Sequence, residues 1–397
     1  MARLIPDGYV CAHANQARIT TFPVADGKKS VKFSQRSKLM NPEVECYYSD
    51  DVVSFASSRG WFKGNDKDFS FSDTYAPVTF TSARFCEIRV WSFFKSVNKD
   101  MEKYLDYASG DLKHDKTFED GISNENGYST NRMPLWIKPD HLIELHEMMN
   151  FMRYHLEGTP LDMTKDVGAG PYGSPYRWRP LTWTVDSVTY CNERAVSTQQ
   201  TGFWFLAQSR SWLPDPVGGI FWFGVDDANS SLLMPMYCSI TRAPEKMAKG
   251  YGAMMEFVDD GAFWVFNQIA NLSYTRYSYI HPEIFAKQQA DEMKFIAMIP
   301  QIDEAAKVLL ETSPSKGVDF LTDFSVATGN SAVLDWKKFY GYLFTRFMDG
   351  NIKTAVEVPE GYIYHNPKLE QPGYPEWFLR MIAEQTGDKL KVPAEGH

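Results

Sequence analysis

Three residues near the start of the chain have side chains that could carry chemistry. Cys11, His13 and Asn15 alternate along an extended segment, which would place them on one face of a β-strand. A thiol, an imidazole and a carboxamide form the Cys-His-Asn set of one class of cysteine protease. However, Cα atoms two residues apart on a strand are about 6.5–7 Å apart, and a nucleophile must reach its base at hydrogen-bond distance. Cys11 is better explained as a core residue, and Asn15 as a carboxamide that can donate to an oxyanion.

A second candidate is Arg84, in the run Ser82-Ala83-Arg84-Phe85 at the start of an expected helix. An arginine in a first helical turn opposes the helix dipole. That position is tolerated when the guanidinium has another task, such as holding a carboxylate. A simple surface arginine is the alternative interpretation.

Two further patterns favour structural roles. The glycine-rich run at residues 166–173 lacks the Lys-Ser/Thr ending of a phosphate-binding loop, so we expect a loop whose glycines adopt unusual backbone angles. The pairs Asp226/Asp227 and Asp162/Asp166 could bind calcium, but the EF-hand spacing is absent, and turn carboxylates are the favoured interpretation. We therefore expect neither a metal site nor a cofactor.

The composition is that of an ordinary folded protein with many aromatic residues. The 397 residues include 41 Lys+Arg and 50 Asp+Glu, and this net charge of −9 argues against a nucleic-acid partner. The five cysteines form no C-x-x-C pair and suggest neither zinc nor disulfides. We expect no signal peptide at the start and no membrane-spanning segment. The 15% aromatic content could serve a bulky core or stacking platforms for a sugar.

The elements that would position these residues follow from hydrophobic spacing. Up to about residue 95 the chain is expected to be mainly β, beginning with a hairpin at residues 3–15 and interrupted by a short helix at 52–59. Later helices and strands are expected at 81–107 (helix), 140–156 (helix with Asp140 as N-cap), 181–240 (antiparallel strands), 262–277 (helix), 283–311 (helix broken at Pro300) and 318–349 (two helices around Gly329-Asn330). The order predicts an α+β fold.

Several collinear blocks carry a family resemblance. They include GYVCAHANQARI at residues 8–19 and TQQTG at 198–202, together with the runs at 83–91, 132–137, 158–183 and 212–216. Across nearly its whole length the chain resembles the dipeptidases related to secernins, best of all their Bacteroides-type members. These are cysteine-type N-terminal-nucleophile (Ntn) hydrolases, more distantly related to bile-salt hydrolases and penicillin V acylases.

The resemblance implies a four-layer αββα sandwich and a mechanism. An amino-terminal cysteine attacks a peptide carbonyl of a dipeptide or small peptide, and its own α-amino group is the base. Asn15 resembles the oxyanion-hole asparagine, and Arg84 resembles the arginine beside the catalytic thiol. His13 and Arg18 are expected near the substrate. Residues 1–260 would form this domain, 261–350 a helical extension packed on it, and 351–397 a mostly irregular tail.

The chain departs from the family at the nucleophile. No cysteine block matches at the start, where Met1 and Ala2 stand, so we expect a truncated, inactive dipeptidase. A scaffold or binding protein of the same fold is one alternative. A carbohydrate-active protein with exposed tryptophans and a carboxylate pair is another. A homo-oligomer is possible, and the sequence leaves the compartment open, although members of this family are often exported.

Overall fold

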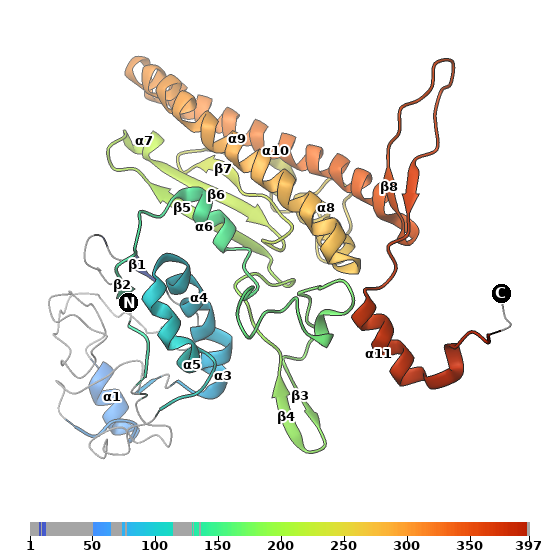
Figure 1. Ribbon diagram of the computed structural model, residues 1–397. Helices are drawn as coiled ribbons and strands as arrows, with labels where there is room; N and C mark the ends of the chain where they lie inside the picture. Colours follow the sequence, from blue (N-terminus) through green and yellow to red (C-terminus); the bar gives the residue numbers. More distant parts are fainter. Residues whose placement is uncertain are drawn as a thin grey trace. The chain divides into compact units, whose positions relative to one another are not determined.

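The computed structural model describes residues 8, 10–12, 51–64, 74–75, 78–113, 129, 131–134 and 136–394 (Figure 1). The chain divides into two compact units. Unit 1 comprises residues 1–147 and 180–196, and unit 2 comprises residues 148–179 and 197–397. Helices and antiparallel strands occur together, which confirms the predicted α+β class. The four-layer arrangement remains a prediction.

The helices of unit 1 follow the predicted spacing. A short helix, α1 (Val52–Ser58), ends just before Gly60, whose φ of +72° suits a glycine. The expected helix at 81–107 is confirmed as a series of shorter pieces. They are α3 (Phe80–Ser82), the π-helical turn η2 (Ala83–Glu87), α4 (Ile88–Val97), the 3-10 helix η3 (Lys99–Tyr104) and α5 (Leu105–Ala108). Their apolar face is buried, with Trp91 and Phe94 fully inaccessible.

Four short strands complete the described part of unit 1. Strand β1 (Val10–Cys11) pairs antiparallel with β2 (Trp136–Ile137), and β3 (Thr182–Val185) pairs with β4 (Val188–Cys191). The turn between β3 and β4 has positive φ at both Asp186 and Ser187, as in the two-residue turns that match the twist of a hairpin. These two strands confirm part of the antiparallel strands expected at 181–240. Residues 3–7, the predicted partner strand of the first hairpin, lie outside the described residues.

The helix predicted at 140–156 is shorter than expected. The structure has α6 (Leu145–Phe151), which begins in unit 1 and ends in unit 2. Asp140 does not cap it, because the Asp140 carboxylate accepts a hydrogen bond from the backbone N–H of Lys99, 3.0 Å away, at the start of η3. The carboxylate therefore accepts its hydrogen bond at the start of η3 and not at the start of α6, and residues 140–144 are irregular.

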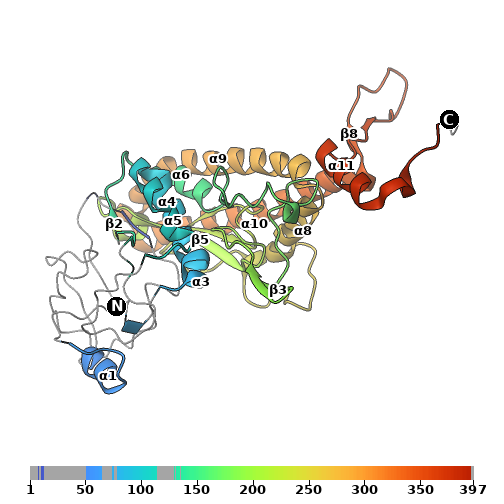
Figure 2. The ribbon, with the colours of Figure 1, turned by 60° about the horizontal axis from the view of Figure 1, so that its bottom comes forward.

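A three-stranded antiparallel sheet forms the centre of unit 2. It has the order β5-β6-β7, with bounds Phe203–Ser209, Gly219–Val225 and Met234–Tyr237. The burial of β6 alternates, with Ile220 and Trp222 fully buried on one side. Helices α8 (Ala262–Thr275), α9 (Tyr277–Thr312) and α10 (Pro314–Phe347) pack with one another and with β6 and β7 (Figure 2).

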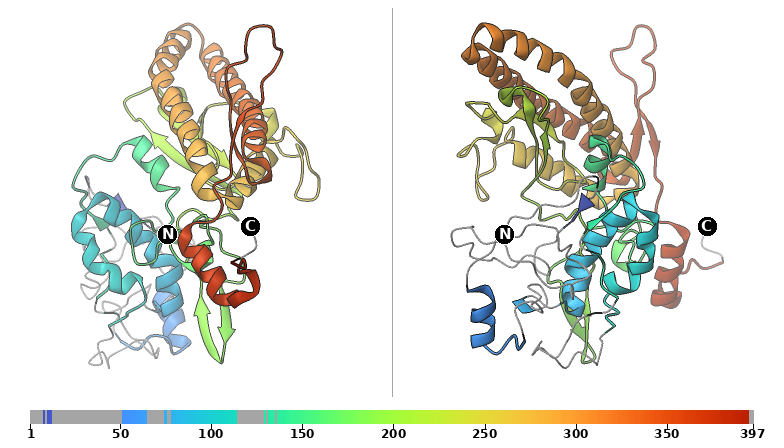
Figure 3. Two further views of the ribbon diagram at one scale, coloured as in Figure 1. Left: turned by 45° about the vertical axis from the view of Figure 1, so that its right-hand side comes forward. Right: turned by 90° about the vertical axis from the view of Figure 1, so that its left-hand side faces the viewer.

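The two longest helices lack the predicted breaks (Figure 3). Helix α9 continues through Pro300, although proline removes one helical hydrogen bond. Packing of α9 along α10 offsets that loss, since Phe295 and Ile299 are buried beside the proline. Helix α10 continues through Gly329, where an added Cβ would lie 2.7 Å from the Pro244 side chain. This glycine permits a close approach of two segments and does not end a helix.

The remaining elements of unit 2 are short. Residues 351–394 contain β8 and β9, which pair with each other, and a helix near the end, joined by irregular segments. The bounds are α7 (Asp215–Gly218), η4 (Val167–Ala169), η5 (Glu245–Met247), η6 (Met348–Gly350), β8 (Ile352–Thr354), β9 (Lys368–Glu370), α11 (Glu376–Thr386) and η7 (Gly387–Leu390). Within the part of the chain that the structure describes, no helix is long and apolar enough to cross a membrane.

Candidate functional site

Of the four predicted site residues, the structure describes Arg84. His13, Asn15 and Arg18 lie outside the described residues. Arg84 belongs to the π-helical turn η2, and the helix leading into it begins with a capping box between Thr79 and Ser82. The Arg84 side chain is therefore beyond the first helical turn. A π-turn inside a helix widens the backbone locally and frequently occurs at functional positions.

The Arg84 guanidinium is half-buried and has few polar partners. Its Nη1 donates one long hydrogen bond of 3.4 Å to the carbonyl of Ser109, and its Cζ lies 5.8 Å from the centre of the Phe80 ring. Among the described residues, no carboxylate forms an ion pair with Arg84. A guanidinium in this state keeps its donors available for an anion.

The thiol of Cys191 is not activated as a nucleophile. Burial raises the pKa of Cys191 on β4, the nearby positive charge of Arg84 opposes that rise, and Glu193 adds to it. A raised pKa lowers the thiolate fraction, which is the reactive form. Cys86 is buried, whereas Cys238 is exposed. Cys11 lies on β1 opposite Trp136.

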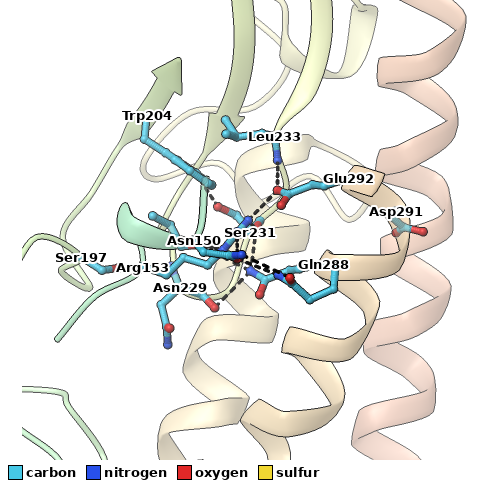
Figure 4. A network of polar contacts seen from close by, with 12 residues as sticks. Asn150, Arg153, Ser197, Trp204, Asn229, Ser231, Leu233, Gln288, Asp291 and Glu292 are labelled. Carbon is cyan, nitrogen blue, oxygen red and sulfur yellow. Dashed lines mark hydrogen bonds and ion pairs between the residues drawn. The ribbon is translucent and has the colours of Figure 1, made fainter. Parts of the chain in front are cut away.

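Unit 2 contains a buried polar network that sequence inspection did not reveal (Figure 4). Its centre is an ion pair of 2.5 Å between Arg153 Nη2 and Glu292 Oε1, with both side chains at most 4% exposed. The same carboxylate oxygen accepts from the backbone N–H of Leu233 at 3.0 Å. Gln288, one turn earlier on α9, donates to three carbonyls of the β6–β7 connection, including that of Ser231 at 2.7 Å. The network fixes the loop that joins the two strands.

A sequence signal for this network exists in the pattern of α9. The buried stripe of that helix is interrupted by Gln288, Glu292 and Asp303. Buried polar residues at such spacing need partners. The partner of Asp303 is Arg210, another buried arginine. The positions of the partners, Arg153 and Arg210, depend on tertiary packing and could not be read from the sequence.

The paired aspartates act as turn residues, as the sequence favours. Asp227 accepts from the Ser197 hydroxyl at 2.6 Å and from the Tyr274 hydroxyl. Asp226 has a φ of +67°, and one of its carboxylate oxygens has no partner although it is buried. Burial raises the pKa of Asp226 to about 7, against the hydrogen bond from Asn267. Asp226 therefore keeps its proton at pH values well above those at which a carboxyl group ordinarily loses it.

The carboxylates at the glycine-rich loop also have structural partners. Asp166 accepts from the N–H of Ala169 and pairs with Arg177 at 3.2 Å, and Gly170 has a φ of +64°. The interpretation as a loop with unusual glycine angles is confirmed. Within the described ranges, no three His, Cys, Asp or Glu side chains are grouped as a metal site would require.

Comparison with protein families agrees with the resemblance seen in the sequence. The model of peptidase family C69 matches residues 1–290, nearly three quarters of the chain. The chain belongs to peptidase family C69. Membership in this family supports a hydrolase that acts on peptide bonds, with a peptide as substrate. A search of curated proteins finds no match.

Proposed function

We propose that this C69 chain is the scaffold of a dipeptidase that uses an amino-terminal cysteine as its nucleophile. The observation that carries the proposal is the family match over residues 1–290. The half-buried guanidinium of Arg84 supports it, because no described carboxylate pairs with Arg84 and its positive charge can stabilise a thiolate or hold a substrate carboxylate.

The proposed reaction passes through a thioester. The α-amino group of the cysteine takes the thiol proton, and the thiolate attacks the carbonyl carbon of the peptide bond. Asn15 donates a hydrogen bond to the oxyanion. The amine product leaves with the proton, and water then attacks the thioester to release the acid and restore the thiol. His13 and Arg18 would contact the substrate beside Arg84.

We assign no nucleophile among the five cysteines of residues 1–397, since none of them stands in a block that resembles the family's nucleophile. The 397-residue chain by itself is therefore expected to hydrolyse no dipeptide. Any longer form that begins with a cysteine is expected to hydrolyse dipeptides.

The test is a dipeptide panel with product detection by amine release. The isolated chain should show no turnover, and Cys11→Ala should change nothing. A longer form with an amino-terminal cysteine should show turnover that alkylation abolishes. Turnover by the isolated chain that is lost in Cys11→Ala would overturn the proposal and identify Cys11 as the nucleophile.

A further inference from the structure

A cavity of about 360 Å³ lies between helices α9 and α10 of unit 2, and it is lined by residues of these two helices alone. Ligand pockets in proteins have volumes of roughly 300–1,000 Å³, so a cavity near the lower end of that range suits a small ligand. None of its lining residues takes part in the buried network of Arg153 and Glu292 or in the proposed reaction. The cavity is therefore a separate feature of unit 2.

The sequence of α10 leaves this space open. Ala327, Thr328, Ser331 and Ala332 line the cavity at three- and four-residue spacing, which places them on one face of the helix. All four side chains are small, whereas the larger side chain of Val333 is buried and does not line the cavity. A larger side chain at Ser331 would therefore fill the cavity.

One wall of the cavity is apolar. Phe295 of α9 is 9% exposed and Ala332 of α10 is 7% exposed, and both line the cavity. Met298, which is half-buried and about one turn further along α9, adds a flexible thioether side chain that adapts to the shape of a ligand. Covering apolar surface with an apolar group is favourable in water. This wall therefore suits an aliphatic or aromatic group of a ligand.

Two carboxylates, Asp291 and Asp335, also line the cavity and share one lysine. Lys287 Nζ lies 3.1 Å from Asp291 Oδ2 and 2.5 Å from Asp335 Oδ2. The indole Nε1 of Trp336 donates to Asp291 Oδ2 at 2.9 Å. Asp291 lies on the side of α9 that faces α10, away from Glu292 (Figure 4). Among the described residues, no donor reaches the Oδ1 atom of either aspartate, so both atoms can accept from a ligand.

Lys287 is fixed between these two carboxylates. Its Nζ also lies 5.7 Å from the centre of the Trp336 ring and 5.6 Å from that of Phe339, where a cation is attracted to the ring faces. Burial acts to lower the pKa of Lys287, but hydrogen bonds to Asp335 and Asp291 outweigh burial, and the pKa is raised. One ammonium group between two carboxylates leaves a net negative charge at this end of the cavity.

A positive charge lies one turn away from this negative end. Lys294 lines the same cavity three residues after Asp291, and Cβ atoms at that spacing on a helix are roughly 5–6 Å apart. Lys294 is exposed, and within the described part of the chain no carboxylate pairs with it. The cavity thus presents a negative and a positive group side by side. A free α-amino acid carries the two complementary groups, an ammonium and a carboxylate, on one carbon atom.

We propose that this cavity binds a free α-amino acid with an apolar side chain. The ammonium group of the ligand donates to Oδ1 of Asp291 and of Asp335, and its carboxylate accepts from Lys294 Nζ. The side chain of the ligand covers the apolar wall at Phe295 and Met298. Because these residues take no part in the proposed reaction, binding here does not depend on turnover.

Binding of L-leucine to the full 397-residue chain tests this site. Titration calorimetry compares leucine with leucinamide, which lacks the carboxylate, and with 4-methylpentanoate, which lacks the ammonium group. Leucine should bind at least about fivefold more tightly than either analogue, because each analogue loses a charge-assisted hydrogen bond. Glycine has both charged groups but no side chain, and it should also bind more weakly than leucine.

Variants of the lining residues assign each contact. Lys294→Gln should make leucine and leucinamide bind equally, and Asp335→Asn should weaken leucine binding by about fivefold or more. Ser331→Leu should fill the cavity and abolish binding. Ala305→Leu on α9 and Asp319→Asn on α10 change exposed residues outside the cavity, and both should bind leucine as the wild type does. Thermal unfolding confirms that each variant is folded.

Three results would overturn the amino-acid site. They are no saturable binding of leucine, equal binding of leucine and both analogues, and leucine binding that persists in folded Ser331→Leu. Leucinamide that binds the wild type as tightly as leucine does would make the ligand a simple amine and would also contradict the proposal. Turnover of dipeptides by a form with an amino-terminal cysteine is measured separately, so failure of the amino-acid site and failure of the proposed function are distinguishable.

Discussion

Three arginines of unit 2 and two arginines of unit 1 differ in their partners. In unit 2, Arg153, Arg177 and Arg210 are buried, and each contacts a carboxylate. In unit 1, Arg84 and Arg194 are half-buried, and neither has a carboxylate among the described residues. A buried charge with a partner holds a structure together, whereas a charge left without one is available for a ligand.

Asp226 shows a third outcome for an unpaired buried charge. A carboxyl group can take up a proton when burial is unfavourable, and the pKa of Asp226 is raised to about 7 for this reason. An arginine cannot respond in this way, because a guanidinium stays protonated in proteins. Arg84 and Arg194 therefore stay charged without a carboxylate partner among the described residues, whereas Asp226 can become neutral.

The largest expected effect is the loss of a paired charge in unit 2. Glu292→Ala should lower the free energy of unfolding by about 3–5 kcal/mol, because it leaves the Arg153 guanidinium buried and unpaired. Urea unfolding measures this change. A loss below about 1 kcal/mol, the value for an exposed pair, would show that the network does not stabilise unit 2.

The Asp226 carboxyl should make the free energy of unfolding depend on pH, with an effect smaller than that of Glu292→Ala. Its pKa is about 7 in the folded chain against 3.8 for an ordinary aspartate. The folded state therefore keeps a proton that the unfolded chain loses, and stability from this group is present below about pH 4 and falls as the pH rises to about 7. Asp226→Asn should remove this slope and stabilise the protein at pH 8 by about 2–4 kcal/mol.

The control for that prediction is an exposed aspartate of the same unit. Asp319→Asn on α10 should leave the slope between pH 4 and 7 unchanged. Urea unfolding at a series of pH values compares the two variants with the wild type. An unchanged slope in Asp226→Asn would mean that Asp226 titrates normally.

Removing an unpaired arginine of unit 1 should have less effect on stability. Arg194→Gln removes a positive charge and breaks no ion pair with a described residue, so the free energy of unfolding should change by about 1 kcal/mol or less in either direction. The same urea experiment measures it. A loss as large as that of Glu292→Ala would place Arg194 among the structural arginines and would remove the distinction between arginines with and without a carboxylate partner.

The smallest effect is expected at an exposed ion pair. Lys307 Nζ lies 2.5 Å from Glu304 Oε1 on the surface of α9, where the Glu304 side chain is 72% exposed. Glu304→Gln should cost about 0.5 kcal/mol or less, and 1 M salt should remove that difference. Urea unfolding measures the change in the free energy of unfolding. A larger loss that persists in 1 M salt would show that the exposure of an ion pair does not predict how much it stabilises the protein.

The sequence predicted elements with a strong apolar period, but it misplaced several breaks and ends. The helices at 52–59, 81–107 and 262–277 and the strands of β5 and β6 follow the pattern. Pro300 and Gly329 were expected to end helices because local propensity disfavours them there. Tertiary packing of α9 against α10, and of Pro244 against Gly329, overrides that propensity.

The candidate site was predictable only in part. Arg84 was singled out by its position near a helix start, and the structure supports its availability for an anion. The π-helical turn that contains Arg84 was not predicted, because the apolar spacing of residues 81–107 is that of an ordinary α-helix. The Arg153–Glu292 pair joins residues 139 positions apart, which no local pattern reveals.

Urea unfolding of Glu292→Ala beside Arg194→Gln tests the central claim most directly. We expect Glu292→Ala to lower the free energy of unfolding by about 3–5 kcal/mol, and Arg194→Gln to change it by about 1 kcal/mol or less. Equal losses in the two variants would contradict the claim that a carboxylate partner distinguishes the structural arginines from the others.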